Sequence, residues 1–508
     1  MLAKIKSYGL YGLDGFMVTV EVDVSNGLTA CDIVGLPDAA VRESRERVRA
    51  AIKNSGYTFP IGRVTVNLAP ADRKKEGSIY DLAIALGILA ATEQIPHELP
   101  DYVYMGELAL DGSVRGINGL LPMVISAYSE GMDTFMVPED NAKETSYIDG
   151  VTAYGISSLR EAAAFLRGEQ QLEPQQKRKW SPKQLNYTSD FSEIKGQYAA
   201  KRAAEIAAAG GHNMLLVGTP GSGKTMLAKS MPSILPELTF DEALEITKLQ
   251  SITGGMTGED GIASERPFRS PHHSASTAAL VGGGQKAQPG EISLAHCGVL
   301  FLDEFPEFQK DVLEALRQPL EDGVVSVARA SFKATYPADF MLVAAMNPCP
   351  CGYFGSRTHE CRCKPYEVSR YRGRISGPML DRIDMHVEMA EVGYSDITSK
   401  TAGESSAAIR KRVDAAREIQ RQRYKDEGII SNSQLTSRLV KKYCKMDERA
   451  ENLMKQAYTK MNLSARAYNR IMKVARTIAD MEGSELITFT HMAEAIQYRS
   501  VDKKYWGD

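Results

Sequence analysis

Alternating apolar and polar residues near the start of the chain predict a mixed α/β domain. A period of two residues is typical of half-buried strands, whereas a continuous apolar stretch of about 12 residues favours a buried helix. The predicted elements are strands at Met17–Val24, Ala30–Val34 and Arg63–Leu68, a helix from a cap at Asp38 to Ser55, and a helix at Tyr80–Ala91. These elements predict an α+β domain over residues 1–167.

A polar segment at residues 168–186 ends this domain. It is rich in Gln and interrupted by Pro174 and Pro182, a composition that cannot bury enough apolar surface to fold by itself. Short apolar strands and helical stretches then follow over residues 187–395, which predicts a second, α/β domain. Long helical periodicity over residues 396–508 predicts a C-terminal domain made of helices.

The most specific chemical motif follows one of the apolar strands. The text Gly-Thr-Pro-Gly-Ser-Gly-Lys-Thr lies between the strand Met214–Val217 and the helical stretch Met226–Ser233, the context that a phosphate-binding P-loop requires. There, backbone N–H groups surround the phosphates, Lys224 adds a positive charge and Thr225 binds magnesium. The predicted ATP-binding residues are Gly218, Thr219, Pro220, Gly221, Ser222, Gly223, Lys224 and Thr225.

Two further apolar strands end in side chains that suit ATP hydrolysis. The strand Gly298–Leu302 precedes Asp303 and Glu304. Asp303 is expected to hold Mg²⁺, directly or through water, and Glu304 to polarise the attacking water; a structural acidic pair is the alternative. A strand beginning at Phe340 ends at Asn347, whose amide can reach the γ-phosphate or the attacking water. This arrangement predicts a doubly wound sheet that binds nucleotide at the carboxyl ends of its strands.

Two arginines are candidates for contacting the γ-phosphate. Arg382 precedes Ile383 and Asp384, and it can stabilise transition-state charge at the site of a neighbouring subunit, which requires an oligomer. Arg466 opens a helix predicted to run to Met481 and can reach the phosphate from the C-terminal domain. A structural salt bridge remains the alternative for each arginine.

Composition limits the classes of function. With 508 residues the chain needs several domains, and its net charge of −3 excludes a uniformly basic nucleic-acid-binding surface. No apolar run reaches the roughly 20 residues of a membrane span, so no membrane partner is expected. The first residues lack the pattern of a signal peptide, which favours a cytoplasmic location.

Four of the seven cysteines lie close together in the sequence. Cys349 and Cys351 form one Cys-x-Cys pair, and Cys361 and Cys363 form another. Four thiolates can close a tetrahedral zinc site, with His359 as a substitute ligand. The Cys-x-Cys spacing is less common than Cys-x-x-Cys, so a Pro- and Gly-rich loop with free thiols remains an alternative interpretation.

Several stretches resemble a known family of ATPases. As a set, the ATP-site residues resemble the AAA+ class, and four stretches are similar to magnesium-chelatase-like ATPases: Gly210–Thr225, Arg269–Ser274, Pro289–His296 and Arg374–Pro378. Within that group the whole chain resembles the bacterial YifB/ComM family. The resemblance implies a hexameric ring that uses ATP and Mg²⁺ and that drives DNA branch migration in recombination or natural transformation.

The resemblance also implies two insertions that line a central pore in similar rings. One is residues 268–288, which include His272, His273 and Lys286; the other is a predicted hairpin at residues 324–338. Lys286, Arg329 and Lys333 are therefore candidate contacts for a DNA backbone. A hairpin that packs only within its own ring is the alternative.

The N-terminal domain resembles the Lon protease domain but departs from it at the catalytic positions. Ile79 occupies the position of the serine nucleophile and Leu121 that of the lysine, and neither can act as a nucleophile or a base. Ser78 is one place from the nucleophile position. The resemblance therefore implies a platform for assembly or DNA contact, with residual peptidase activity as the alternative.

Three functions remain compatible with an AAA+ core. The first is a DNA motor that moves branch points, the second a chelatase-type ring that remodels a protein partner, and the third a protein unfoldase with a lapsed protease domain. The Lon-like domain favours the first, because the resemblance is to YifB/ComM and not to the chelatase subunit.

Overall fold

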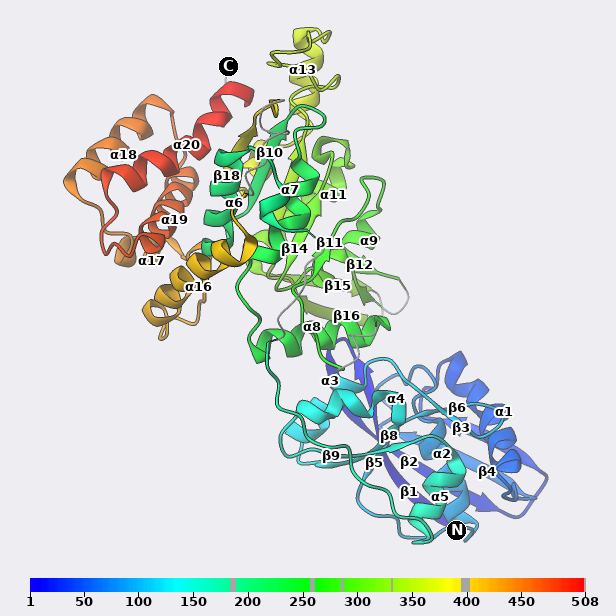
Figure 1. The fold of residues 1–508 in the computed structure, drawn as a ribbon. Coiled ribbons are helices and arrows are strands. Elements are labelled where there is room, and N and C mark those ends of the chain that lie inside the picture. Colours follow the sequence, from blue (N-terminus) through cyan, green and yellow to red (C-terminus); the bar gives the residue numbers. More distant parts are fainter. Residues whose placement is uncertain (183–188, 256–260, 285–286, 330–331, 394–402, 507–508) are drawn as a thin grey trace. The chain divides into compact units, whose positions relative to one another are not determined.

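The chain folds into two compact units (Figure 1). The computed structural model describes residues 1–182, 189–255, 261–284, 287–329, 332–393 and 403–506. Unit 1 comprises Met1–Ser181, Phe240–Ser264 and Ala330–Thr335, and unit 2 comprises Pro182–Thr239, Glu265–Arg329 and Tyr336–Asp508.

Unit 1 is built on a seven-stranded sheet with the order β3-β4-β2-β1-β5-β8-β9. β1 and β2 form a long antiparallel hairpin, β4 pairs antiparallel with β2, and the other neighbours pair in parallel. The strands are β1 (Leu2–Tyr11), β2 (Asp14–Ser25), β3 (Ala30–Val34), β4 (Arg63–Ala69), β5 (Val103–Tyr104), β8 (Thr134–Pro138) and β9 (Thr152–Ile156).

Helices cover both faces of this sheet. Ile5 of β1 belongs to the apolar cluster that includes helix α2, whereas Tyr8 belongs to the cluster that includes α3. Odd-numbered and even-numbered residues of a regular strand point to opposite faces, so α2 and α3 pack on opposite faces of the sheet. The main helices of this unit are α1 (Ala39–Asn54), α2 (Asp81–Ala91), α3 (Leu120–Ser129), α5 (Leu159–Leu166) and α8 (Phe240–Thr253).

The five N-terminal elements predicted from the sequence are confirmed, but the central strand β1 was not predicted. Asp38 caps α1 as expected, because its carboxylate accepts a hydrogen bond from the Val41 N–H at 2.8 Å. β1 has a weak apolar signal, since Lys4 and Lys6 occupy its outward positions and Ser7 lies at a buried one. The place of β1 in the sheet depends on its pairing with β2. A pattern of apolar and polar residues within β1 does not show which strand it will pair with.

Helix α8 is separated from the rest of unit 1 in sequence, yet it packs there. It contacts α3, and the Gly119 N–H donates to the Ser251 carbonyl at 2.9 Å. The polar segment that follows α5 also lies along unit 1, where the Gln175 N–H donates to the Ala153 carbonyl at 2.7 Å. These residues from 171 to 182 have no regular secondary structure.

Unit 2 contains a five-stranded parallel sheet with the order β11-β14-β17-β10-β18. Its strands are β10 (Met214–Gly218), β11 (Phe268–Arg269), β14 (Val299–Leu302), β17 (Met341–Met346) and β18 (Met385–Met389). The helices α6 (Tyr198–Gly210) and α7 (Lys224–Ser230) flank β10. The strands β15 (Val324–Arg329) and β16 (Phe332–Pro337) form a separate two-stranded sheet; β15 belongs to unit 2, and residues 332–335 of β16 belong to unit 1.

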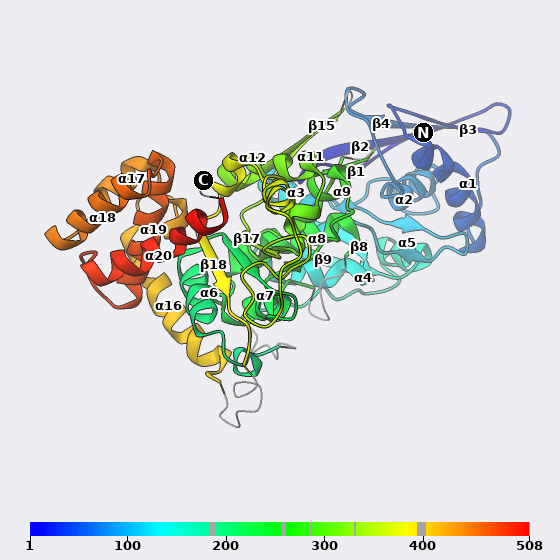
Figure 2. The ribbon, with the colours of Figure 1, turned by 90° about the horizontal axis from the view of Figure 1, so that it is seen from above.

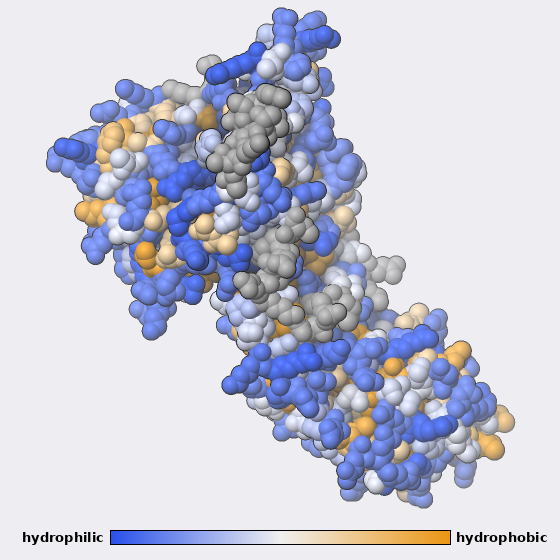
Figure 3. All heavy atoms as spheres, viewed as in Figure 1, coloured by the Kyte–Doolittle hydropathy of each residue, from blue (hydrophilic) through white to orange (hydrophobic). Residues whose placement is uncertain are grey.

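The end of unit 2 is helical, as predicted, and Figure 2 shows these helices grouped together. They are α16 (Ser406–Arg423), α17 (Ser437–Tyr443), α18 (Glu448–Lys460), α19 (Ala465–Met481) and α20 (Phe489–Trp506). On the face shown in Figure 3, hydrophobic residues are scattered among hydrophilic ones. Among the described helices, none has the length and apolar character needed to cross a membrane.

A buried polar network joins the parallel sheet to the C-terminal helices. Asp384, just before β18, forms an ion pair with Arg470 of α19 and accepts a hydrogen bond from the Asn213 N–H at 3.0 Å. His212 lies 3.6 Å from Asp384 and 2.7 Å from the Thr477 hydroxyl. Burial opposes ionisation of Asp384, but Arg470 and His212 hold its pKa well below the usual range.

We expect Asp384→Ala to destabilise unit 2, because the buried His212 and the largely buried Arg470 then lose the carboxylate beside them. Removing one partner of a buried ion pair costs about 3–5 kcal/mol. Urea denaturation followed by circular dichroism should show a lower midpoint. Asp426→Ala, which removes an exposed carboxylate, is the matched control; equal midpoints for the two variants would contradict this account.

Candidate functional site

The P-loop connects the end of β10 to the start of α7. Gly221 and Gly223 have φ angles of 78° and 89°, a left-handed conformation that favours glycine. A Cβ atom on Gly218 would lie 2.8 Å from the Ser222 hydroxyl and 3.0 Å from the Met389 carbonyl. The loop therefore needs these glycines to turn tightly and to present its N–H groups at a helix N-terminus, where phosphates bind.

Lys224 lies inside the P-loop. Its ammonium group donates to the carbonyls of Gly218 at 2.7 Å and Thr219 at 2.9 Å, and to the Asn347 side-chain oxygen at 3.1 Å. Burial lowers the pKa of Lys224 to about 8, although Asp303 partly opposes this shift. The lysine is thus already beside the amide at the end of the neighbouring strand β17.

Thr225, in the first turn of α7, also contacts Asp303, which directly follows β14. The Thr225 hydroxyl donates to one Asp303 carboxylate oxygen at 2.8 Å, and the other oxygen accepts from the Glu304 N–H at 2.9 Å. A hydroxyl and a carboxylate at this separation offer the hard oxygen ligands that Mg²⁺ prefers. The donor set therefore fits a magnesium ion bound to nucleotide.

Glu304 has a neighbour that the sequence did not assign to it. Its carboxylate lies 3.0 Å from Nδ1 of His273. The His273 ring lies against that of His272, with centroids 4.1 Å apart and the ring planes tilted by 35°. Glu304 itself adopts a left-handed conformation, with φ at 52°, which turns the chain sharply after Asp303. The sequence identified His273 only as part of an insertion, because no local pattern links it to a residue 31 positions away.

The two candidate arginines, Arg382 and Arg466, lie in different surroundings. Arg382 is buried; it forms an ion pair with Glu321 at 2.6 Å and donates to the carbonyls of Arg317 and Pro378. Arg466 is exposed in the first turn of α19. Within a single chain, Arg382 is therefore held by its own subunit.

The candidate DNA contacts are only partly described. The Lys333 side chain is exposed, and its N–H donates to the Tyr11 hydroxyl at 3.1 Å within unit 1. Lys286 and the side chain of Arg329 lie outside the described residues. The predicted hairpin that carries Arg329 and Lys333 corresponds to β15 and β16.

Ser78 has no lysine partner among the contacts that the structure describes. Ser78 donates to the Glu107 carboxylate, and Lys75 is buried against the carbonyls of Pro70 and Arg73. Burial lowers the pKa of Lys75. Leu121 is buried in the apolar core. The described contacts thus give Ser78 a carboxylate neighbour rather than a lysine.

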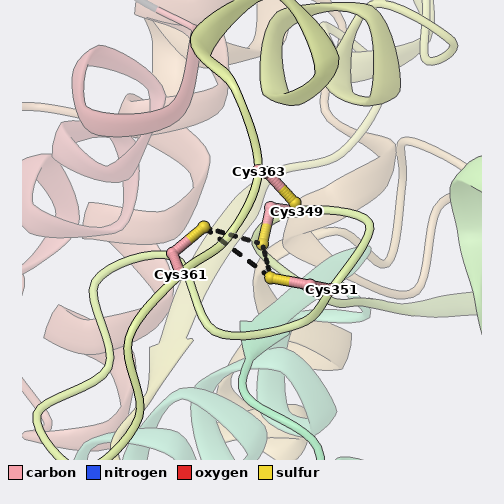
Figure 4. Close-up of side chains that lie close together, drawn as sticks. All are labelled: Cys349, Cys351, Cys361 and Cys363. Carbon is pink, nitrogen blue, oxygen red and sulfur yellow. Dashed lines mark hydrogen bonds between the residues drawn. The ribbon is translucent and has the colours of Figure 1, made fainter.

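The four clustered cysteines converge in the loop after β17 (Figure 4). We call Cys349, Cys351, Cys361 and Cys363 the cysteine cluster. The Sγ atom of Cys349 lies 3.4 Å from that of Cys351 and 3.7 Å from that of Cys361. All four sulfur atoms lie within 4.8 Å of one another. His359 stands apart from this cluster, stacked on Tyr353 at 4.8 Å.

The pKa values of two thiols in the cluster, Cys349 and Cys351, are shifted in opposite directions. Burial raises the pKa of Cys349 to about 12. Burial also opposes ionisation of Cys351, but the N–H groups of Tyr353 and Arg362, with the neighbouring thiols, lower its pKa to about 6.

Comparison with known proteins identifies the family. Three family descriptions match in succession: subunit ChlI of Mg-chelatase over residues 20–141, magnesium chelatase subunit ChlI over residues 190–397, and the C-terminal part of that subunit over residues 403–499. A magnesium-chelatase 67 kDa subunit of Chlorobaculum parvum is 30% identical over 164 residues, which cover 31% of this chain and 23% of that protein.

Two other relatives match over nearly their whole length. The YifB protein of Escherichia coli K12 is 44% identical over 505 residues, covering 99% of this chain and 98% of the relative. The competence protein ComM of Haemophilus influenzae is 43% identical over 506 residues, covering 98% of each. The chain therefore belongs to the YifB/ComM family of magnesium-chelatase-like AAA+ proteins.

Proposed function

We propose that this protein is an ATP hydrolase that works as a hexameric ring and moves branch points in DNA. The observation that carries the ATPase proposal is the meeting of Lys224 with Asn347 and of Thr225 with Asp303, at the carboxyl ends of neighbouring parallel strands. This edge is where open α/β sheets bind nucleotides. The proposed cofactors are ATP, Mg²⁺ and, at the cysteine cluster, zinc.

Each residue of the site has a distinct proposed role. Thr225 and Asp303 hold Mg²⁺, which neutralises charge on the phosphates when it is bound. Lys224 binds the β- and γ-phosphates, so it must leave the P-loop carbonyls. Glu304 polarises the attacking water, and Asn347 orients that water or the γ-phosphate.

The proposed roles of the arginines require other subunits or a moved helix. Arg382 acts on the γ-phosphate of a neighbouring subunit, for which it must exchange its ion pair with Glu321 for the phosphate. Arg466 contacts the nucleotide from the C-terminal helices. Both roles concern the charge that develops on the phosphate in the transition state.

The DNA-motor proposal rests on the family to which the chain belongs. A chelatase-type remodelling ring is the second candidate. Three descriptions of chelatase subunit ChlI match most of the chain, but the 67 kDa subunit of Chlorobaculum parvum matches only 31% of it. A protein unfoldase is the third. We propose that the Lon-like N-terminal domain is a platform for assembly or DNA contact, since Ile79 and Leu121 occupy the positions of the catalytic pair.

Two substitutions should lower ATP hydrolysis for different reasons: Lys224→Ala by weakening ATP binding, and Glu304→Gln by slowing the chemical step. Lys224→Ala should weaken ATP binding at least about tenfold, because it removes a charge-assisted hydrogen bond to phosphate worth about 1.5–3 kcal/mol. Glu304→Gln should keep ATP binding but lower kcat by about 10²–10⁴. Equilibrium binding of a fluorescent nucleotide and steady-state phosphate release measure the two effects. Parent-like turnover by Glu304→Gln would remove Glu304 from its assigned role.

Subunit mixing tests the trans role of Arg382. Rings that combine Arg382→Ala and Glu304→Gln subunits contain some interfaces with both native residues, so their ATPase activity should exceed that of either variant alone. Thermal denaturation of Arg382→Ala should be checked first, because this change leaves Glu321 without its partner. If subunit exchange is demonstrated and no mixing ratio restores activity, Arg382 does not act in trans.

The DNA proposal predicts a salt-dependent contact at the hairpin. Lys333→Ala should weaken binding to all DNA sequences alike and reduce the salt slope by up to ~1 per engaged subunit. Basal ATPase activity should persist while movement of a four-way junction is lost. Lys425→Ala, another exposed lysine, is the control. A parent protein without affinity for junction or single-stranded DNA at low salt would instead favour the protein-remodelling ring.

A further inference from the structure

We propose that the cysteine cluster binds one Zn²⁺ ion through four thiolates, and that this metal fastens the end of β17 to the P-loop and to the last helix, α20. The zinc would have a structural role that determines how Asn347 is presented to the nucleotide. The part concerning Asn347 rests on the proposed ATPase function, whereas the metal site itself does not.

The separations between sulfur atoms fit a tetrahedral metal site. With Zn–S bonds of about 2.3 Å, the sulfur atoms of a tetrahedron lie about 3.8 Å apart. The cluster has separations of 3.4, 3.7 and 3.7 Å among Cys349, Cys351 and Cys361. A disulfide would bring two sulfurs to about 2.05 Å, and all four residues are free cysteines. The thiols therefore already surround a space of the right size.

The local backbone supports this arrangement. Gly352, directly after Cys351, has a φ angle of 87°, and its N–H donates to the Cys349 carbonyl at 3.0 Å. This tight turn brings the first two thiols to the same side of the loop. The Phe354 N–H then donates to the Cys349 sulfur at 3.3 Å. Such N–H groups stabilise charge on metal-bound thiolates and orient them.

A buried cation stands beside the cluster. Four thiolates and one Zn²⁺ ion carry a net charge of −2, which needs compensation inside a protein. The Arg372 guanidinium is buried, and it lies over the ring of Phe354 at 4.5 Å and over that of Tyr505 at 4.8 Å. Its Nη2 atom is buried and has no hydrogen-bond partner among the described residues. Arg372 is thus a cation placed to balance a charged thiolate site.

The same residues connect three parts of unit 2. Cys349 follows Asn347 by two residues, and a Cβ atom on Gly352 would lie 2.7 Å from the ring of Pro220 in the P-loop. Arg372 donates to the Pro348 carbonyl at 3.0 Å and to the Tyr505 carbonyl of α20 at 3.0 Å. Closing the cluster on a metal would therefore restrain the loop that supports Asn347, the P-loop and the C-terminal helix together.

The metal site can be tested without ATP. Protein purified without chelator should contain one zinc per chain by mass spectrometric metal analysis. Replacement by Co²⁺ should produce the visible absorption of tetrahedral cobalt with thiolate ligands. Cys361→Ser should lose both signals, whereas Cys31→Ser, which changes a cysteine outside the cluster, should keep them. Parent protein with neither zinc nor a tetrahedral cobalt spectrum would overturn the proposal.

The structural role is tested by comparing kcat with nucleotide affinity. Cys361→Ser should bind ATP nearly as the parent does but have a kcat lower by about tenfold or more, because changes in the groups that orient a site typically cost about 10–100-fold. Cys363→His should keep zinc, since Cys₃His sites also bind it, and should keep most of the parent's kcat. This conservative variant separates metal loss from a failure to fold.

Amide hydrogen exchange can show whether the zinc site restrains the loop and α20, independently of whether the protein hydrolyses ATP. Metal-free Cys361→Ser should exchange amide hydrogens faster than the parent at residues 341–354 and in α20, and Cys363→His should not. If the parent binds zinc but hydrolyses no ATP, the metal site stands and the proposed function fails. If the metal-free variant has parent-like kcat and exchange, the fastening role is wrong.

Discussion

The proposed nucleotide site depends on the register of three neighbouring parallel strands. β17 lies between β14 and β10, and pairing of Val217 with Met346 places the P-loop beside Asn347. Pairing of Leu302 with Ala344 places Asp303 at the same edge. A shift of one residue in a strand reverses the direction of every side chain, so this register decides whether the lysine, the carboxylate and the amide can meet.

Buried polar contacts, together with a shared apolar cluster, hold the C-terminal helices against this sheet. Asp384 and His212 connect the start of β10 and β18 to α19, while Arg372 connects the loop after β17 to α20. A buried charge is costly unless it is paired, so these groups strongly favour one docking of the C-terminal helices on the sheet. That docking also determines the position of Arg466 in the first turn of α19.

The insertion that carries His273 adds a contact at the same edge. Its ring lies 3.0 Å from the Glu304 carboxylate, so the residue assigned to polarise water is already engaged by a loop that the family resemblance places in a pore. By contrast, Arg382 is engaged by Glu321 of its own chain. Within one chain, two proposed catalytic residues, Glu304 and Arg382, are thus each paired with a side chain that is distant in the sequence.

The sequence by itself determined the elements and residues whose signals are local. Periodicity located the strands and helices of the first domain, and the P-loop spacing identified Lys224 and Thr225, because a phosphate-binding turn is made by consecutive residues. Tertiary structure alone decided the central position of β1 and the packing of α8 in unit 1. It also decided the partners of Glu304 and Arg382. Each of these depends on contacts between residues distant in the chain, and a one-dimensional pattern does not record which distant segments become neighbours when the chain buries its apolar surface.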